Sequence, residues 1–301
     1  MKVLNYGSLN VDYVYSVEKL VKPGTTIADK GLKVMSGGKG LNQSVAIAKA
    51  GIQEIYHAGN IGRNGDFLKL TLLEHNIKID YIQKSNSDTG HAIIQYSDEG
   101  EHTIIVHGGS NYNNQKDTMQ SVLEHFEEGD ILLVQNEIND VDYIIDLAYE
   151  KNMKIIVNPA PFHESVYRFD FSKVDTLIVN ETELYSIAHA ASVEEAIQRL
   201  QKYDLNIVIT LGDKGGLYVG RDMSQIPYKS HLVDVVDTTA VGDAFVGYFV
   251  AGLVNGMAIK DILDYSSKAG ALAATVEGSA ISIPSRREVE RLSKEMENDE
   301  N

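Results

Sequence analysis

The chain has 301 residues, 43% of them hydrophobic and 23% charged, so it can bury a large core as one α/β unit with an appendage. Its formal net charge of −16 argues against a nucleic-acid or anionic-membrane partner, because both need basic patches. The absence of cysteine excludes disulfides and thiolate chemistry, and no run approaches the roughly 18 apolar residues of a membrane span. We expect a cytoplasmic protein.

The first part of the chain is rich in predicted strands. A short strand, KVLNYG, precedes the alternating segment VDYVYSVE, and residues 91–107 have the pattern of a hairpin that turns at Asp98-Glu99-Gly100. Between them the pattern is helical from Asn42 to Ala50 and ends at Gly51. We expect the segments 13–41 and 91–109 to pair as a small β-sheet lid.

From about residue 115, apolar strands alternate with helices of roughly 10–15 residues. The pattern predicts strands in DILLVQ, KIIVNPAP, DTLIVN and NIVITLGD, with helices between them. This alternation is typical of a parallel sheet wound with helices, in which ligands bind at the carboxyl ends of the strands. Residues 1–12, 42–90 and 110–301 would form this α/β body.

Two early motifs place polar groups at predicted strand ends. Asn10 and Asp12 follow the first strand in GSLNVD, where a carboxylate can accept hydrogen bonds from the vicinal hydroxyls of a sugar. An ordinary turn explains Asp12 equally well, and Glu137 is ambiguous in the same way. GGKGLNQ, at 37–43, lets the backbone approach a ligand, although Asn42 could simply cap a helix; it is neither a Walker A loop nor a dinucleotide fingerprint.

Two later motifs suit a nucleotide. In VNETEL, Asn180 and Glu183 could hold hydrated Mg²⁺ at a strand end, or could merely cap and stabilise the following helix. ITLGDKGG, at 209–216, is a strand followed by a glycine turn that suits phosphates or ribose, and a plain turn explains it nearly as well.

VDTTAVGDAF carries the sharpest signal. Consecutive amides of Ala240, Val241 and Gly242 open a helix and would form an anion hole supported by the helix dipole. Asp243 then lies in the first turn, beside any bound phosphoryl group, where phosphoryl transfer needs a base. The alternative, an acid that stabilises a helix N-terminus, explains Asp243 but not the small residues before it.

Together, GSLNVD, GGKGLNQ, QNE, NPAP, NETE, TLGDKG and DTTAVGD follow the order of the ribokinase, or PfkB-type, family of sugar kinases, which the whole chain resembles. The resemblance implies an α/β fold, with a Rossmann-like sheet covered by helices on both faces and a small β-sheet lid, often a clasp between two subunits. It also implies ATP-dependent phosphorylation of a sugar's primary hydroxyl. We expect a homodimer that binds sugar and ATP.

The resemblance assigns roles by motif. Asp243 would be the catalytic base, with Ala240, Val241 and Gly242 as the anion hole. The sugar would contact Asn10, Asp12, Gly38, Lys39, Asn42 and Glu137. Thr210 and Gly212 would lie along the nucleotide, Asn180 and Glu183 would organise Mg²⁺ through water, and Ser266 stands where an adenine-side Asn is expected. An activating K⁺ would be held by Asp237, Thr239, Ala273, Val276, Gly278 and Ser282.

Two departures bear on the substrate. Thr25 replaces a common Glu, and Leu41 replaces the usual Ala in the glycine loop. We expect phosphorylation of D-ribose to D-ribose 5-phosphate, with fructose, tagatose, deoxyribose, another pentose or a nucleoside as alternatives. From a different class, a sugar-binding protein without catalysis is possible on the same scaffold. A nicotinamide-dependent oxidoreductase would need a glycine fingerprint after the first strand, and GSLNVD is not one.

Overall fold

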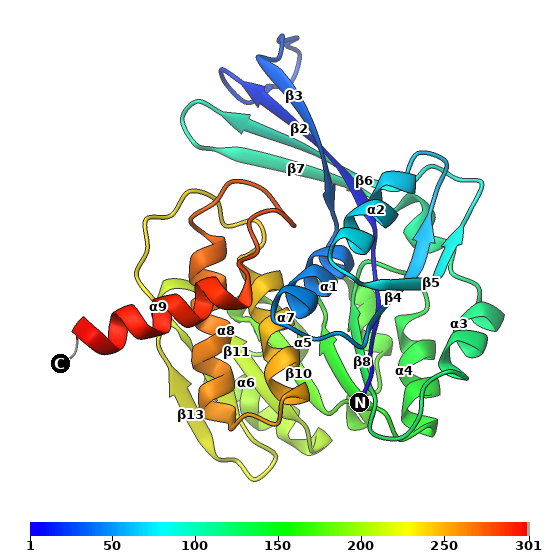
Figure 1. Cartoon of the computed structure of the whole chain (residues 1–301), viewed down its shortest axis with the longest axis vertical. Helices are drawn as coiled ribbons and strands as arrows, with labels where there is room; N and C mark the ends of the chain where they lie inside the picture. Colours follow the sequence, from blue (N-terminus) through cyan, green and yellow to red (C-terminus); the bar gives the residue numbers. More distant parts are fainter. Residues whose placement is uncertain (300–301) are drawn as a thin grey trace.

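The structure is a computed structural model that describes residues 1–299, with side chains as far as residue 293. These residues form a nine-stranded sheet and a separate four-stranded sheet. Figure 1 shows the smaller sheet projecting from one end of the larger α/β body. The α/β class and the separate small sheet predicted from the sequence are both confirmed.

The large sheet has the strand order β13-β12-β11-β10-β9-β8-β1-β4-β5. Its parallel strands are β1 (Val3–Tyr6), β4 (Ile55–Ile61), β5 (Lys78–Lys84), β8 (Ile131–Gln135), β9 (Lys154–Asn158), β10 (Thr176–Asn180) and β11 (Asn206–Thr210), and an antiparallel edge adds β12 (Gly216–Val219) and β13 (Gln225–Tyr228). The chain adds strands on one side of β1 and then on the other. The point between β1 and β8 is therefore a topological switch point, where such sheets bind ligands.

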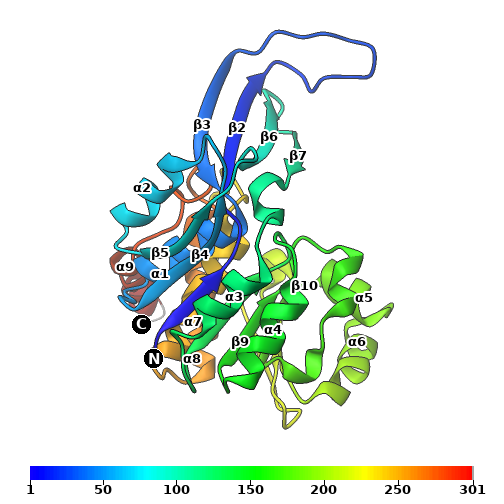
Figure 2. The same cartoon turned by 90° about the vertical axis from the view of Figure 1, so that its right-hand side faces the viewer.

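Helices cover both faces of this sheet because its strands are apolar on both sides. On β8, Ile131 and Leu133 join one buried cluster, and Leu132 and Val134 join the other. The first face carries α1 (Lys39–Lys49), α2 (Asp66–Glu74), α7 (Val241–Val254), α8 (Ile259–Ala273) and α9 (Arg286–Asp299). The second carries α3 (Lys116–Leu123), α4 (Val141–Glu150), α5 (Glu181–Ala188) and α6 (Val193–Leu200), and Figure 2 shows the two layers on opposite sides.

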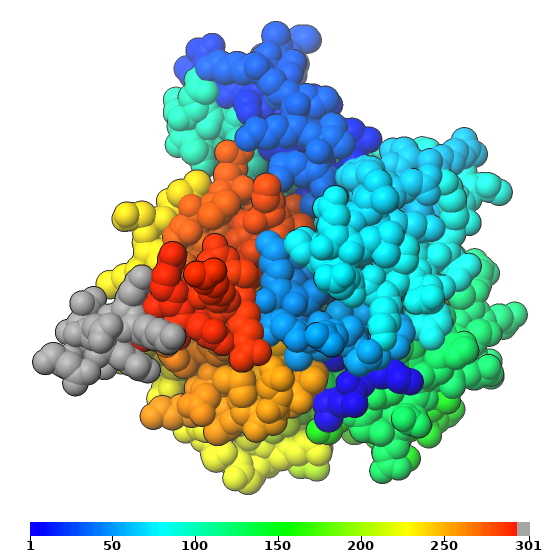
Figure 3. All heavy atoms as spheres, in the orientation of Figure 1, coloured from blue at the N-terminus to red at the C-terminus, as the bar shows by residue number. Residues whose placement is uncertain are grey.

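The small sheet has the order β3-β2-β6-β7, formed by β3 (Gly31–Gly37), β2 (Asn10–Val17), β6 (Gly90–Ser97) and β7 (His102–His107). β2 pairs in parallel with β6, and the two outer pairs are antiparallel. One face carries a small apolar cluster of Val14, Ala92 and Ile94. In Figure 3 this sheet stands out from the body at the top of the molecule.

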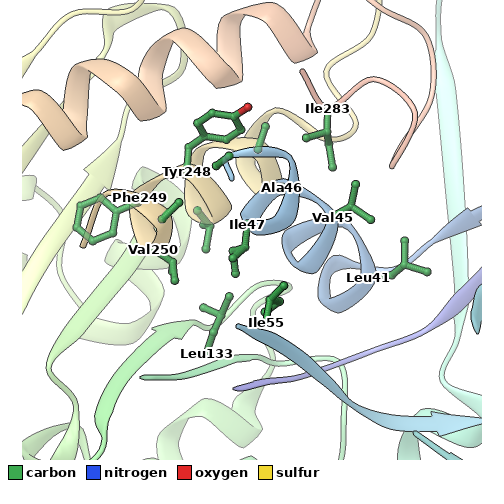
Figure 4. Packing of buried hydrophobic residues seen from close by; sticks show 14 of the residues in the cluster. Leu41, Val45, Ala46, Ile47, Ile55, Leu133, Tyr248, Phe249, Val250 and Ile283 are labelled. Atoms are coloured by element: carbon green, nitrogen blue, oxygen red, sulfur yellow. The ribbon is translucent and has the colours of Figure 1, made fainter. Parts of the chain in front are cut away.

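α7 is largely enclosed by the body, since every residue from Asp243 to Gly252 is buried. It crosses α1 closely at Gly247, where an added Cβ would lie 2.3 Å from Ala46 Cβ and 3.0 Å from the carbonyl oxygen of Gln43. Figure 4 shows Ile47 between α1 and the sheet residues Ile55 and Leu133, while Tyr248 points from α7 away from the sheet. The position of α7 is thus fixed from all sides.

Two expectations about local boundaries need correction. α1 begins at Lys39 after the N-cap residue Gly38, so Asn42 lies within the helix and does not cap it. The small sheet begins at Asn10, and the boundary predicted between residues 41 and 42 falls inside α1. The division of the chain into two domains stays a prediction. No helix within residues 1–299 is both long and apolar enough to cross a membrane.

Candidate active site

The candidate site lies where β1, β8, β9 and β10 end and where α1 and α7 begin. Ser8 follows β1, Glu137 follows β8, and Asn180 ends β10. Because these strands are parallel, their carboxyl ends share one edge of the sheet. The start of α1 and the start of α7 meet this same edge through Asn42 and Asp243.

The N-terminus of α1 is capped by residues far away in the sequence. Gly38 has φ = 91°, a left-handed conformation that favours glycine, and offers no side chain as a cap. Instead the Lys39 amide donates to Glu137 Oε2 at 2.9 Å, and the Gly40 amide donates to Ser8 Oγ at 3.1 Å. The Ser8 hydroxyl donates to the same Glu137 oxygen. This arrangement places the Glu137 carboxylate at the positive end of the helix dipole.

Asp243 lies in the first turn of α7 and is only 4% exposed. Its Oδ2 accepts a hydrogen bond from Asn42 Nδ2 at 2.9 Å, and its Oδ1 accepts one from Gln43 Nε2 at 2.9 Å. Both oxygens act as acceptors, as a proton-accepting base requires. Asn42 Oδ1 is buried beside this pair and has no hydrogen-bond partner among the described residues.

Asp12 is a second buried carboxylate of the site, and it accepts fewer hydrogen bonds from the protein than Asp243 does. It is 6% exposed, and its hydrogen bond comes from Ser279 Oγ at 3.2 Å. Burial raises the pKa of Asp12 to about 7; the Ser279 hydrogen bond opposes this, and the Glu137 and Asp243 carboxylates add to it. Burial likewise raises the pKa of Glu137, although the Lys39 ammonium, the Ser8 hydroxyl and the Lys39 amide offset part of the effect.

Lys39 is the cation of the site. Burial by itself lowers the pKa of Lys39, but the carboxylates of Asp243, Glu137 and Glu183 outweigh burial and hold it above its usual value. Its ammonium makes no hydrogen bond or ion pair with the described residues. A charged ammonium without a direct partner is available to an anionic ligand oxygen.

The N-terminus of α7 offers free amide donors. Ala240 is the N-cap and makes no side-chain cap hydrogen bond. Within residues 1–299, the amides of Ala240, Gly242 and Asp243 donate to no acceptor, and that of Val241 reaches the Thr238 carbonyl at 3.3 Å. A Cβ on Gly242 would meet no atom within 4 Å, so open space lies above these donors. Donors and space together suit an oxyanion.

Asn180 and Glu183 form a reciprocal cap at the start of α5. The Glu183 amide donates to Asn180 Oδ1 at 2.8 Å, and the Asn180 amide donates to Glu183 Oε2 at 3.0 Å, which leaves Oε1 free. Burial raises the pKa of Glu183, while the Asn180 amide and the Lys39 ammonium lower it. The described residues contain no cluster of three acids or histidines that could hold a metal, so one carboxylate with a hydrated ion is the arrangement that fits.

The three remaining residues predicted to contact the nucleotide do not share one environment. Thr210 pairs directly with Asn180 across β10 and β11, and Gly212 follows it in a left-handed conformation with open space around it. Ser266 is fully buried in α8, where its hydroxyl donates to the Ile262 carbonyl at 2.7 Å. Thr210 and Gly212 therefore stand at the strand edge, whereas the Ser266 side chain is occupied within its own helix.

The residues predicted for a monovalent cation also come together. Asp237 Oδ1 accepts from the Thr239 amide at 3.0 Å, and Oδ2 accepts from the Gly278 amide at 2.9 Å, which joins the two loops. Although burial opposes it, hydrogen bonds from the Thr239 hydroxyl and from the Gly278 and Thr239 amides hold the pKa of Asp237 below its usual value. No lysine of residues 1–293 forms an ion pair with this carboxylate. Ala273 ends α8, and Val276 and Ser282 lie on either side of Gly278 in the following loop.

Sequence reasoning missed several polar residues of the site. Ser8 and Gln43 stand inside motifs that were singled out, and Gln135, Asn136 and Asn158 end buried strands, which is the signal that could have found them. Asn111 also escaped notice, although its side chain donates to Asn10 Oδ1 at 2.7 Å and so orients a predicted sugar contact. Ser8, Gln43 and Asn111 contact predicted site residues directly.

Known proteins share both the sequence and the fold. The chain matches the pfkB family of carbohydrate kinases over residues 1–286. The ribokinase of Staphylococcus aureus (strain COL) is 30% identical over 305 residues, spanning 97% of this chain and 99% of that one. The crystal structure of a ribokinase from Thermotoga maritima has a TM-score of 0.88 at 30% identity, covering 98% of this chain and 99% of that one. The structure of Arabidopsis thaliana ribokinase complexed with ribose and ATP has a TM-score of 0.81 at 25% identity, with 97% and 98% covered.

The family match spans every motif on which the resemblance was drawn, from GSLNVD to DTTAVGD. The resemblance and the expected enzyme class are therefore confirmed. A buried carboxylate and free helix amides lie where the family signature falls. The chain belongs to the pfkB family of carbohydrate kinases, which are phosphotransferases.

Proposed function

We propose that the protein transfers the γ-phosphoryl group of ATP to the primary hydroxyl of D-ribose, giving D-ribose 5-phosphate. The observation that carries this proposal is an excess of buried acceptors over donors. Asp12, Asp243 and Asn42 Oδ1 can accept more hydrogen bonds than the protein supplies. A ligand with several adjacent hydroxyl groups provides the missing donors.

The geometry supports a division of roles. Asp243, fixed by Asn42 and Gln43, would take the proton of the attacking hydroxyl. The free amides of Ala240, Gly242 and Asp243 would stabilise the charge of the transferring phosphoryl group, with the Lys39 ammonium nearby. Asn10, Asp12, Gly38 and Glu137 would orient the sugar. When bound, Mg²⁺ neutralises phosphate charge, and Glu183 Oε1 is available to its water shell.

Ribose is favoured by the relatives. The chain is 30% identical to a Staphylococcus aureus ribokinase over nearly its whole length, and the Arabidopsis ribokinase structure holds ribose and ATP. Fructose, tagatose, deoxyribose and nucleosides are the competing substrates. Thr210 and Gly212, at the carboxyl end of β11, would lie along the nucleotide. The Ser266 hydroxyl already donates to the Ile262 carbonyl, so we expect Ser266 to contribute to the adenine side by packing alone.

A monovalent cation fits beside the anion hole. The Asp237 carboxylate, held between two loops, and the carbonyl groups of Thr239, Ala273, Val276 and Gly278, with Ser282, would hold K⁺. The carbonyls of Thr239, Val276 and Gly278 accept no hydrogen bond within the described residues, so they remain available as ligands. A cation there would stabilise the turn that presents the free amides.

The small sheet supports the predicted homodimer. Its outer face presents the exposed apolar side chains of Leu32, Val34 and Ile105, continuous across paired strands with Tyr13, Tyr15 and Ile93. An exposed apolar patch of this kind is typical of an interface. We propose that this patch packs against the same patch on a second copy of the chain. The cytoplasmic location stays a prediction from composition.

An ADP-release assay across ribose, deoxyribose, fructose, tagatose and nucleosides, with and without K⁺, tests the proposal. We expect the highest kcat/KM on ribose and a requirement for Mg²⁺. Turnover of another sugar in preference to ribose would change the substrate but keep the reaction. If none of these compounds is phosphorylated, the non-catalytic sugar-binding alternative gains support, and ribose binding by calorimetry distinguishes it.

Asp243→Asn tests the base. We expect kcat to fall by at least about 10³-fold while ribose binding persists, because the side chain keeps its shape but cannot take a proton. Asp261→Asn is the matched control, since Asp261 is an exposed acid in the first turn of α8 and belongs to none of the predicted site motifs. An equal fall in kcat in both variants would show that the substitution acts only through the loss of a charge at a helix N-terminus.

A further inference from the structure

Behind Asp243, Gln43 belongs to a chain of buried amide side chains whose other members have no role in the proposed reaction. Gln43 Nε2 donates to Asp243 Oδ1 and also to Asn158 Oδ1, each at 2.9 Å. Gln43 Oε1 accepts from Gln135 Nε2 at 2.7 Å, and Gln135 Nε2 donates in turn to Asn5 Oδ1 at 3.0 Å. Residues of three strands and two helices of the body therefore meet in one hydrogen-bonded network.

Main-chain carbonyls at both ends set the direction of this network. Asn158 Nδ2 donates to the Ile178 carbonyl at 2.9 Å, so the Asn158 oxygen must face Gln43 as an acceptor. At the other end Asn5 Nδ2 donates to the Gly40 carbonyl at 2.7 Å, so the Asn5 oxygen must face Gln135. A carbonyl oxygen can only accept, and each amide is thereby fixed in one of its two orientations.

At the end of the network away from Asp243, the hydrogen bonds keep the same donor-to-acceptor direction. Asn5 Nδ2 also donates to Ser44 Oγ at 2.8 Å, and the Ser44 hydroxyl lies 2.8 Å from His57 Nδ1. Burial lowers the pKa of His57 to about 3, so the ring is neutral and its Nδ1 can accept from Ser44. No protonated group therefore opposes the direction in which the amides point.

We infer that Gln43 is a positioning residue for Asp243, locked by Gln135, Asn5 and Asn158 so that it always presents an N–H group to Oδ1. A buried amide free to rotate would also sample the orientation that points its oxygen at the carboxylate. The network removes that state, so the carboxylate keeps one rotamer and the orientation needed to meet a substrate hydroxyl. Gln43 itself exchanges no proton with the substrate.

The inference rests on the proposed function, and the experiment separates the two. We would measure kcat, ribose KM and thermal unfolding for Gln43→Met, Gln135→Met and the double variant, with Gln83→Met as control for the same chemical change on an exposed part of β5. A wild-type protein that phosphorylates no sugar defeats the proposed function. An active wild type with unimpaired variants defeats only this inference.

We expect Gln43→Met to lower kcat at least about 10-fold, with ribose KM changed less than about threefold, because Asp12 and Asn42 remain in place. Gln135→Met, one residue further from the carboxylate, should lower kcat by a smaller factor. The double variant should be no slower than Gln43→Met alone, since Gln135 acts only through Gln43. Losses that multiply, or a Gln43→Met variant within twofold of wild-type kcat, would overturn the inference.

A second variant covers the case in which Gln43→Met does not fold. Gln135→Glu replaces two donated hydrogen bonds by an acceptor and keeps the shape of the side chain. The new carboxylate would face Gln43 Oε1, so it should rotate the Gln43 amide or leave Oε1 without a donor. We therefore expect kcat to fall more than in Gln135→Met, at unchanged ribose KM. Equal kcat in Gln135→Glu and wild type would contradict the directional network.

Discussion

The hydroxyl of Tyr96, on strand β6 of the small sheet, lies 3.2 Å from Asp237 Oδ1 in the loop that precedes α7. It also lies 3.0 Å from the Thr239 hydroxyl, which donates to the same carboxylate oxygen. A residue of the lid thus reaches the loop proposed to hold K⁺. Movement of the small sheet away from the body must break this contact, so lid position and the geometry of the cation loop are linked.

Tyr96→Phe tests this link. The ring remains packed but Asp237 loses one donor, so we expect the K⁺ concentration for half-maximal activity to rise severalfold and the unfolding free energy to fall by about 1 kcal/mol. Kinetic titration with K⁺ provides the measurement. Tyr15→Phe is the control, because Tyr15 lies on the opposite face of the same sheet and its hydroxyl makes no hydrogen bond in the described structure. An identical K⁺ response in both variants would rule out the link.

Gly242→Ala separates a ligand role from a folding role. Nothing lies within 4 Å of an added Cβ, and the backbone at Gly242 does not have a positive φ, so the fold should be as stable as wild type or up to about 1 kcal/mol more stable. The methyl group would nevertheless occupy the space above the free amides. We expect kcat to fall by about 10²-fold.

Thermal unfolding and steady-state kinetics on the same preparation check this prediction. Gly31→Ala, at an open position in β3, serves as a control that should change neither quantity appreciably. A Gly242→Ala enzyme with full activity would mean that no phosphoryl group occupies that space during the reaction.

Asp12 predicts a pH dependence. Its pKa is about 7 in the folded protein against an ordinary 3.8, so the folded protein holds this proton more tightly than the unfolded chain. The stabilising contribution is present below about pH 4 and is lost as pH rises to 7, by at most about 4 kcal/mol. Sugar hydroxyls donate best to the ionised carboxylate, so the ribose KM should fall as pH rises from 6 to 8.

Asp12→Asn provides the comparison. The variant should be more stable than wild type at pH 8 without ligand, since no buried charge remains, and its ribose KM should be higher and nearly independent of pH. Chemical denaturation at pH 5 and pH 8, together with KM values across that range, would measure both effects. A ribose KM with the same pH profile in wild type and variant would contradict the assignment of Asp12 to the sugar.

The outer face of the lid predicts a substitution that alters assembly. Ile105 is 65% exposed in the single chain, and a charge there would have to be buried if two lids pack face to face. Ile105→Glu should therefore shift a dimer to monomer in analytical ultracentrifugation. Leu70→Glu, on exposed α2, introduces the same charge away from the lid and should leave assembly unchanged. A wild-type protein that sediments as a monomer would contradict the proposed homodimer.

The sequence predicted those parts of the fold that depend on local pattern. Each apolar run such as ILLVQ carries its own periodicity, and a polar residue at its end marks the edge where ligands bind. Asp243 could be singled out because the small residues and the glycine stand next to it. The alternation of strands and helices after residue 115 followed from the same signals, whereas β4, β5, β12 and β13 were not predicted.

Contacts between distant residues were not predictable from one sequence. α1 starts three residues before Asn42 because Glu137 and Ser8 satisfy its first amides, and these partners lie 98 and 32 residues away. Tyr96 looked like an ordinary strand residue, since its partner Asp237 is 141 positions along the chain. Local capping rules could not anticipate either case, because the donors and acceptors meet only after the sheet has formed.

The close crossing of α1 and α7 at Gly247 has a consequence for how this enzyme can vary. Gly247 lies one turn beyond Asp243, and an added methyl would press on Ala46 and on the backbone of Gln43. Widening the crossing would lengthen the Gln43–Asp243 hydrogen bond without altering any residue that contacts the substrate in the proposed function. Inactive natural variants could therefore carry an intact set of pocket residues, and a survey restricted to the pocket would misclassify them as active kinases.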